Sequence, residues 1–408
     1  MSELSYLEKL LDGVEVEWLP LGEVSALRRG RVMSKGYLTE NFGPYPVYSS
    51  QTANNGKIGS INTFDFDGEY ISWTTDGANA GTVFYRTGKF SITNVCGLIT
   101  LKSKCPLIYK FLFYWLTIEA KKHVYSGMGN PKLMSHQVEN IPVPIPCPDN
   151  PEKSLAIQSE IVRILDKFTA LTAELTAELT AELNMRKKQY NYYRDQLLSF
   201  NTEDVPHLPM GQKDIGEFIR GGTFQKKDFI DAGVGCIHYG QIYTYYGTYT
   251  EKTKTYISTA LAKKCKKAHK GDLIIATTSE NDEDVCKAVA WLGSEDIAVS
   301  SDACIYKHNL NPKYVSYFFQ TEQFQNQKRQ YITGAKVRRV NADNLSKILI
   351  PVPSMEIQER IVSILDKFDT LTNSITEGLP REIELRQKQY EYYRDLLFSF
   401  PKPETVSN

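Results

Sequence analysis

An internal repeat is the feature that most constrains how this 408-residue chain can fold. Residues 155–200 align with residues 355–400 at an offset of 200 without a gap, and 25 of these 46 positions are identical. Both copies read IQ..IV.ILDKF and then R.KQY.YYRD.L.SF. The residues between the copies diverge, so two variable blocks alternate with two repeated segments. This self-similarity predicts a duplicated architecture with two individual variable domains.

The first repeated segment is predicted to be one long helix. Its apolar residues recur every three or four positions between Ile157 and Leu175, and neither Gly nor Pro lies among them. Prolines mark the end of the preceding strand-rich block, and Ser154 is the expected N-cap. A helix from Ser154 to Ser199 is roughly 70 Å long, which is more than a compact domain needs.

The second repeated segment contains Gly378 and Pro380, which predict two helices near 355–377 and 381–399 with a kink between them. Two amphipathic segments of this length favour an antiparallel, coiled-coil-like pair. Such a pair would relate the two halves of the chain by a pseudo-two-fold axis and hold the variable domains at opposite ends of a stalk.

Both variable blocks are predicted to be small α/β domains, which gives the chain a mixed α+β fold class. Residues 43–85 alternate Val, Ile, Tyr and Phe with the turn residues Gly, Asn and Asp, as short strands do. Residues 106–116 and 312–324 show matching helical patterns, one in each block. The expected domains are therefore a first variable domain at 1–153, a spacer helix at 154–200, a second variable domain at 201–354 and a distal helical region at 355–408.

Composition excludes several classes of protein. With 41% hydrophobic and 24% charged residues, the chain resembles ordinary soluble proteins, and no run of 18 apolar residues indicates a membrane span. The N-terminal MSELSYLEKLLDG lacks the regions of a signal peptide, so we expect a cytoplasmic protein. The seven cysteines are scattered and never spaced as C-x-x-C, which indicates reduced, mostly buried thiols and no zinc site.

Catalytic motifs are absent from the sequence. It contains no phosphate-binding loop, no G-x-G-x-x-G, no H-E-x-x-H and no nucleophile elbow, and its six histidines are spread singly. Acidic residues crowd at 280–284 before Lys287, which fits a solvated loop better than the metal site of a nuclease. We therefore expect no catalytic residue, no metal and no cofactor on this chain.

Local clusters in both variable blocks suit DNA binding, although 48 basic residues balance 48 acidic ones overall. Arginine and lysine beside glycine turns can bind phosphates or guanine edges, amide and hydroxyl side chains can read base edges, and aromatic rings lie among them. In the first block the candidate residues are Arg28, Arg29, Arg31, Lys35, Tyr48, Ser50, Gln51, Asn54, Asn55, Lys57 and Trp73. In the second they are Arg220, Lys226, Lys227, Tyr239, Gln241, Tyr243, Thr277, Thr278, Asn281, Lys336, Arg338 and Arg339.

Taken together, these motifs resemble the specificity subunit of type I restriction-modification enzymes. The repeated helix patterns and the TAEL run at 171–183 resemble its type IC branch. In the first block, the phrases G-x-YPVY..Q...NG..G and DG.YI.....GA.AG.V.Y resemble its target recognition domains. The likeness extends over essentially the whole chain.

The resemblance implies a division of labour. Each variable domain would read one half of a split target in double-stranded DNA, and the helices would space the halves and dock two methyltransferase subunits. Those partners would bring S-adenosylmethionine and methylate adenine N6, and two restriction subunits would bring ATP- and magnesium-dependent translocation and cleavage. The chain itself would be a non-catalytic subunit of host defence.

The repeated helices carry two further hypotheses. The TAEL run places spacer leucines at Leu171, Leu175, Leu179 and Leu183, and four helical residues advance about 6 Å with a net turn of about 40°. One unit therefore nearly matches the rotation of one base-pair step, roughly 34–36°. Aromatic and basic residues near the helix ends are candidates for a subunit interface, or else for packing against the chain's own domains: Tyr190, Tyr192, Tyr193, Arg194, Tyr390, Tyr392, Tyr393 and Arg394.

Two alternatives remain at this point. The first is a nuclease that acts alone through the acidic residues at 280–287. The second is a structural coiled-coil adaptor that does not contact DNA, which leaves unexplained why the two domains differ while their helices do not.

Overall fold

The computed structural model describes residues 9–401 apart from 11, 12, 14, 128 and 374–376. It divides into two compact units: unit 1 combines Met1–Thr176 with Leu385–Asn408, and unit 2 is Ala177–Glu384. No described helix is long and apolar enough to cross a membrane. The seven cysteines are free thiols and four of them are buried, as expected.

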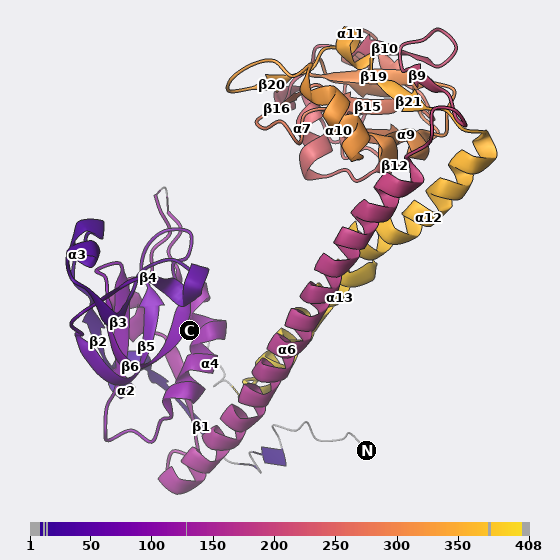
Figure 1. Ribbon diagram of the computed structural model, residues 1–408. Coiled ribbons are helices and arrows are strands. Elements are labelled where there is room, and N and C mark those ends of the chain that lie inside the picture. The colour runs from indigo at the N-terminus through magenta and orange to yellow at the C-terminus, as the bar shows by residue number, and fades with distance from the viewer. Residues whose placement is uncertain (1–8, 11–12, 14, 128, 374–376, 402–408) are drawn as a thin grey trace. The chain divides into compact units, whose positions relative to one another are not determined.

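Unit 1 is built on a six-stranded sheet in the order β2-β7-β5-β6-β3-β4. Figure 1 labels β2, β3, β4, β5 and β6 of this sheet. Its central strand β5 pairs antiparallel with β6 and β7, and its second half is buried because Ile71 and Trp73 enter the core beside α4. A separate two-stranded sheet pairs β1 with β8. The strands are β1 Val16–Pro20, β2 Ser25–Arg29, β3 Phe42–Tyr48, β4 Lys57–Ile61, β5 Phe66–Thr74, β6 Val83–Ile92, β7 Cys96–Leu101 and β8 Pro142–Pro146. The helices of this domain are α2 Leu21–Val24, α3 Lys35–Glu40, η1 Ala53–Gly56, α4 Tyr109–Glu119, η2 Ala120–His123 and α5 Ser135–Glu139.

Unit 2 contains a five-stranded sheet, β10-β19-β15-β17-β12, and a four-stranded sheet, β13-β11-β18-β14. Short sheets pair β16 with β20 and β9 with β21. The strands are β9 His207–Pro209, β10 Gly216–Arg220, β11 Val234–Ile237, β12 Tyr249–Thr250, β13 Thr255–Ile257, β14 Lys267–Ala268, β15 Leu273–Ala276, β16 Thr278–Ser279, β17 Ala288–Trp291, β18 Ile297–Val299, β19 Ala303–His308, β20 Arg338–Arg339 and β21 Leu349–Pro351. The helices are η3 Lys226–Asp228, α7 Tyr239–Thr244, α8 Thr259–Ala262, α9 Pro312–Phe318, α10 Glu322–Arg329 and α11 Ala342–Leu345 (Figure 1).

The first repeated segment forms the 47-residue helix α6, Pro151–Leu197. The expected N-cap at Ser154 is wrong, because the helix begins one turn earlier and Asn150 Oδ1 accepts from the Lys153 N–H at 3.0 Å. Ser154 is instead buried, and its hydroxyl accepts from Gln158 Nε2. The side chain of Gln158 bonds to the start of the α4 region, at Pro106 O and Ile108 N, and so holds the helix to the domain.

The second repeated segment forms two helices, α12 Met355–Asn373 and α13 Gly378–Leu397, as its Gly and Pro predict. Residues 374–376 lie outside the described residues, and α13 begins at Gly378, before the predicted start at 381. Gly378 has φ +78°, and a Cβ there would lie 2.5 Å from the Thr370 carbonyl oxygen. The glycine therefore fits this position for two reasons, its backbone conformation and the close approach of the preceding helix.

Each unit pairs the beginning of one repeated segment with the end of the other. In unit 1, Phe168 of α6 packs on Tyr393 of α13 with ring centroids 5.6 Å apart. In unit 2, Phe368 of α12 packs on Tyr193 of α6 at 5.7 Å. The next contact in each unit, Thr169 with Tyr390 and Asp369 with Tyr190, moves forward along one helix and backward along the other, so the helices pair antiparallel within each unit. The mixed α+β class, with two sheet domains joined by long helices that contact each other, is confirmed.

Candidate nucleic-acid interface

Three predicted clusters of unit 2 converge on one pocket. Arg220 ends β10, Thr277 and Thr278 follow β15, and β16 pairs antiparallel with β20, which contains Arg339. The four side chains line a cavity of about 300 Å³ together with Ser301, Asp302, Tyr331, Thr333, Asn341 and Asn344. Segments far apart in sequence are thus brought together at one edge of the unit.

The acidic loop at 280–284 directly follows β16 and is held in place by bonds to Arg338 and Lys328. Asp282 forms a 2.8 Å ion pair with Arg338, and Asn281 Nδ2 donates to Asp284 Oδ2. The fully buried Lys328 donates to the carbonyl oxygens of Glu283 and Val285, and burial lowers its pKa. No cluster of metal ligands occurs among the described residues, and the loop is exposed.

Several predicted residues of unit 2 serve its own structure. Gln241 is 8% exposed, accepts from the His238 N–H at the start of α7 and donates to Thr255. Tyr243 donates its hydroxyl to the Thr278 carbonyl oxygen, and the Thr278 side chain is 7% exposed. Tyr239 is half-buried against the His238 ring, whereas Lys226, Lys227, Asn281 and Lys336 are exposed.

In unit 1 the basic residues lie at the end of β2 and in the following turn. Arg28 and Arg29 are both exposed, and Arg29 Nη2 donates to Asn94 O at 2.9 Å. Arg31 is paired with Asp65 at 3.0 Å. Lys35 is exposed in the first turn of α3.

The asparagine-rich turn of unit 1 presents side chains to solvent. Asn54 and Asn55 adopt left-handed φ values of 49° and 53°, a conformation that asparagine tolerates better than most residues, and both are exposed. Gln51 donates to the Lys57 carbonyl oxygen within the same turn, where Ser50 is half-buried and Lys57 exposed.

Arg86 holds this turn in place and was not anticipated from the sequence. It is 3% exposed, stacks over the Tyr48 ring at 3.6 Å and donates from Nη1 to the Asn55 carbonyl oxygen at 2.8 Å. Desolvation by burial lowers its pKa to about 10. The Tyr48 ring therefore forms a cation–π contact with Arg86 of its own domain. A lone Arg in a strand gave no signal of this role.

Trp73 is a core residue, which corrects its placement among DNA-contacting aromatics. It is 1% exposed, and its indole N–H donates to the Leu133 carbonyl oxygen at 3.0 Å. A Cβ on Gly97 of the neighbouring strand would lie 2.1 Å from its ring. The sequence could not separate this packed ring from an exposed stacking surface.

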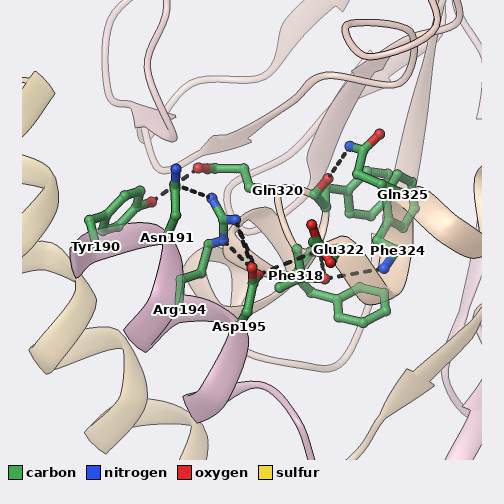
Figure 2. Close-up of polar contacts among 11 residues, drawn as sticks. Tyr190, Asn191, Arg194, Asp195, Phe318, Gln320, Glu322, Phe324 and Gln325 are labelled. Carbon is green, nitrogen blue, oxygen red and sulfur yellow. Dashed lines mark hydrogen bonds and ion pairs between the residues drawn. The ribbon is translucent and has the colours of Figure 1, made fainter. Parts of the chain in front are cut away.

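The residues near the helix ends differ in how deeply the units bury them. Tyr190 is 4% exposed and donates to Gln320 Oε1 at 3.0 Å, while Arg194 is 8% exposed and bonds to Asn191 and Asp195 (Figure 2). These two residues pack against their own domain, the alternative left open by the sequence. Of their counterparts in unit 1, Tyr390 accepts from Thr169, Arg394 donates to Thr117, and both are half-buried.

The remaining tyrosines face solvent. Tyr192 and Tyr392 are 61% and 63% exposed, and Tyr193 and Tyr393 are 45% and 39% exposed. The spacer leucines lie on α6, with Leu171 exposed and Leu175, Leu179 and Leu183 partly buried.

Comparison with known proteins identifies the family. Residues 13–185 and 209–385 each match the type I restriction modification DNA specificity domain. The chain is 41% identical to the EcoR124I/EcoR124II specificity subunit of Escherichia coli over 100% of both chains. It is 35% identical to the EcoprrI specificity subunit of Escherichia coli, over 92% of this chain and 93% of the relative.

A solved structure shares the fold of this chain. A solved chain, from work on complex assembly and conformational transition of the type I R-M system, matches with a TM-score of 0.63 at 14% identity. The match covers 94% of this chain and 97% of that chain, and shows a shared fold. The two family-model matches and the full-length relative identify a DNA specificity protein. The chain belongs to the type I restriction-modification specificity subunits, the non-catalytic members of these complexes.

Proposed function

We propose that each unit reads one half of a split target in double-stranded DNA, while the long helices set the spacing and dock the methyltransferase subunits. The family model matches the chain twice, once for each unit, which supports two separate readings. The relatives are subunits of type I restriction enzymes, so two methyltransferase and two restriction subunits are the proposed partners. S-adenosylmethionine, ATP and magnesium would bind to those partners, and the complex would act in the cytoplasm.

The domain assignment follows from this function. Residues 1–153 and 201–354 would be the recognition domains, 154–200 the spacer helix and 355–408 the distal helical region. Each recognition domain packs on helices from both repeated segments, so each compact unit extends beyond its recognition domain.

The proposed DNA surface contains the exposed candidates of each unit. Trp73 and Gln241 are left out because both are buried and bonded within the chain. In unit 1 the surface comprises Arg28, Arg29, Lys35, Asn54, Asn55 and Lys57, with Arg31 and Gln51 at its edge. In unit 2 it comprises the exposed Arg220, Lys226, Lys227, Asn281, Lys336 and Arg339, together with the half-buried Thr277, and Arg338 is held by Asp282.

The convergence of Arg220 and Arg339 on one pocket, beside Thr277, carries the proposal, because the guanidinium groups there can bind DNA. Methylome sequencing of cells that express the chain with its methyltransferase subunit tests it. We expect a split, adenine-methylated motif. An N54A/N55A variant should alter or abolish recognition of only one half, whereas the exposed Lys104→Ala should leave the motif intact. No new methylation with the unaltered chain would contradict the proposal.

The spacer proposal has its own test. Deletion of residues 172–175 removes one TAEL unit, about 6 Å and 40° of helix, which approximates one base-pair step in rotation. We expect the unspecified gap of the methylated motif to shorten by one base pair with both half-sites unchanged. An unchanged gap, or altered half-sites, would contradict a spacing role for α6.

A further inference from the structure

Each unit places an arginine followed by a glycine at the same point of its sheet. Arg29 ends β2, which runs antiparallel to β7, and Arg220 ends β10, which runs antiparallel to β19. The following residues, Gly30 and Gly221, each donate an N–H to the first residue of the neighbouring strand. The two arginines are therefore equivalent, although the flanking sequences LRRGRV and FIRGGT share little else.

Packing explains the glycines but not the arginines. A Cβ on Gly30 would lie 2.2 Å from the Ile92 carbonyl oxygen, and a Cβ on Gly221 would lie 2.1 Å from the Ser300 carbonyl oxygen. No larger residue fits these positions without a backbone shift. Both arginine side chains, in contrast, are exposed, and neither forms an ion pair with a carboxylate in the described part of the chain.

Equivalent loop carbonyls orient the two guanidinium groups. Arg29 Nη2 donates to Asn94 O at 2.9 Å, and Arg220 Nε donates to Ser301 O at 3.2 Å. Asn94 and Ser301 occupy the same position, because each lies two residues before the first residue of its strand, β7 or β19. Each arginine keeps further N–H groups for a ligand, because a guanidinium carries five.

A second cation and a threonine occupy matching places in the two units. The residue after Lys132 donates its N–H to the Thr75 carbonyl oxygen, and the residue after Arg339 donates its N–H to the Thr277 carbonyl oxygen. Lys132 and Arg339 are thus counterparts. Lys132 was missed in the sequence because it stands alone in GNPKLMS, and only the strand pairing aligns it with Arg339.

The pocket of unit 2 shows what such a cluster can bind. Arg220, Arg339 and Thr277 line the same cavity of about 300 Å³, and their two positive charges outnumber the one carboxylate there, Asp302. A phosphodiester carries one negative charge and several acceptor oxygens, which suit guanidinium donors. The Thr277 hydroxyl donates to the Asp302 carbonyl oxygen, so the two arginines supply the donors for a phosphate.

We propose that Arg29 with Lys132, and Arg220 with Arg339, form a DNA phosphate-binding subsite that is repeated in both units. The proposal rests on the proposed function, because it assigns phosphate binding and base reading to different residues of the proposed DNA surface. Two units that read different sequences can share only contacts that carry no sequence information, and backbone contacts are of this kind. Base reading would then lie with loops that differ between the units, such as the asparagine turn of unit 1.

The test measures the salt dependence of DNA binding by the full chain purified with its methyltransferase subunit. One probe is a duplex containing the motif found by methylome sequencing, and the other is a scrambled duplex of the same length. We expect Arg29→Ala and Arg220→Ala each to weaken binding to both duplexes by about three- to tenfold near 0.1 M salt. The slope of log K against log salt should fall by about 0.9 for each lost contact, while the methylated motif is unchanged. Arg29→Lys and Arg220→Lys should retain most of the slope.

Arg329→Ala is the matched control in unit 2. Its guanidinium is also exposed but bonds to Asn326 within α10, so its removal should leave the slope unchanged. A changed half-site in the Arg29 or Arg220 variants would show base reading and overturn the inference. A lowered unfolding temperature with an unchanged slope would show a purely structural role and also overturn it. If the unaltered chain directs no split motif, the proposed function fails; if it does and the variants keep the full slope, only this inference fails.

Discussion

The two units attach their sheet domains to the long helices with the same polar clamp. In unit 1, Asp166 of α6 accepts from Lys110 at 2.6 Å and from Tyr114 at 2.7 Å. In unit 2, Asp366 of α12 accepts from Lys313 and Tyr317, both at 2.7 Å. The aspartates lie 200 residues apart, as the repeat requires, and their partners come from divergent domains. Duplication has thus preserved an attachment while the attached surfaces changed.

The units differ one helical turn further along. Unit 1 has Thr169, whose hydroxyl bonds to Tyr390, while unit 2 has Asp369, which accepts from Asn373 and Thr248. Burial raises the pKa of the Asp369 carboxyl. Unit 2 also buries Tyr190 more deeply than unit 1 buries its counterpart Tyr390. The shared clamp therefore tolerates different polar surroundings, and their energetic consequences can be measured unit by unit.

The largest effect is expected from truncating Phe398, whose ring lies in the core of unit 1. Phe398 is 4% exposed and packs on Phe111 and Trp115, with ring centroids 5.2 and 5.7 Å apart. Phe398→Ala should destabilise unit 1 by about 3–5 kcal/mol through lost packing and a cavity. Amide hydrogen exchange should rise in β5 and β7 but not in β15 and β19. The nearby Leu396→Ala, at a 37% exposed position, should have little effect, and equal exchange in both units would refute the assignment.

A second effect should be confined to unit 2. Lys328→Met removes a buried cation that bonds to two carbonyl oxygens of the acidic loop, at a cost of about 1–3 kcal/mol for unsatisfied acceptors. In unit 1 the loop after β5 is closed differently, by the Thr74 hydroxyl donating to the Asn79 carbonyl oxygen. We therefore expect faster amide exchange at 279–286 in this variant, with no change at 75–82. The adjacent exposed Arg329→Met serves as the control, and unchanged exchange at 279–286 would show that the loop does not depend on Lys328.

A smaller effect concerns the docking of partners, in which the two units should be equal. Tyr192 and Tyr392 are exposed by nearly the same fraction and stand 200 residues apart in the repeat. If both contact methyltransferase subunits, Tyr192→Ala and Tyr392→Ala should each weaken binding of one subunit by about tenfold, as for an aromatic interface residue. Titration of the full chain with the methyltransferase subunit measures this. Tyr245→Ala, also an exposed tyrosine at 56%, should leave binding unchanged, and equal loss in that variant would remove the docking assignment.

The long helices and their break could be predicted from the sequence because they depend on local signals. Apolar spacing, the absence of Gly and Pro in the first copy and their presence in the second fix α6, α12 and α13. The predicted N-cap, Ser154, lies one turn after the observed one, Asn150. Asn and Ser are both good N-cap residues, so the local sequence could not choose between them.

The candidate surface could be predicted only in part, because burial depends on strand pairing. Trp73 and Gln241 have the chemistry of DNA-contacting residues, but the fold encloses both. Lys132 and Arg86 stand alone in sequence, and only the paired strands and the loops that they join give them neighbours. Residue type indicated the right chemistry, while long-range pairing determined which side chains reach solvent.

The smallest effect should come from exchanging the residues that distinguish the two attachments. Because burial disfavours the charged form, the pKa of Asp369 in the folded chain lies above its ordinary value of 3.8. Protonation of Asp369 stabilises the folded state fully at pH values below its pKa in the unfolded chain. This stabilisation is lost as the pH rises through the higher pKa of Asp369 in the folded chain. Asp369→Asn removes that loss, so it should raise the unfolding temperature of unit 2 at neutral pH and have little effect near pH 4. Scanning calorimetry of the full chain at both pH values measures the difference.

The reverse exchange completes this comparison. Thr169→Asp places a carboxylate at an exposed position beside Asp166 and Tyr114, where the like charge of Asp166 opposes its ionisation. Unit 1 should therefore lose stability at neutral pH and recover it as the pH falls, which gives unit 1 the pH dependence of unit 2. If both substitutions leave the two pH profiles unchanged, the carboxylate at this turn has no energetic consequence, and the units differ there in sequence alone.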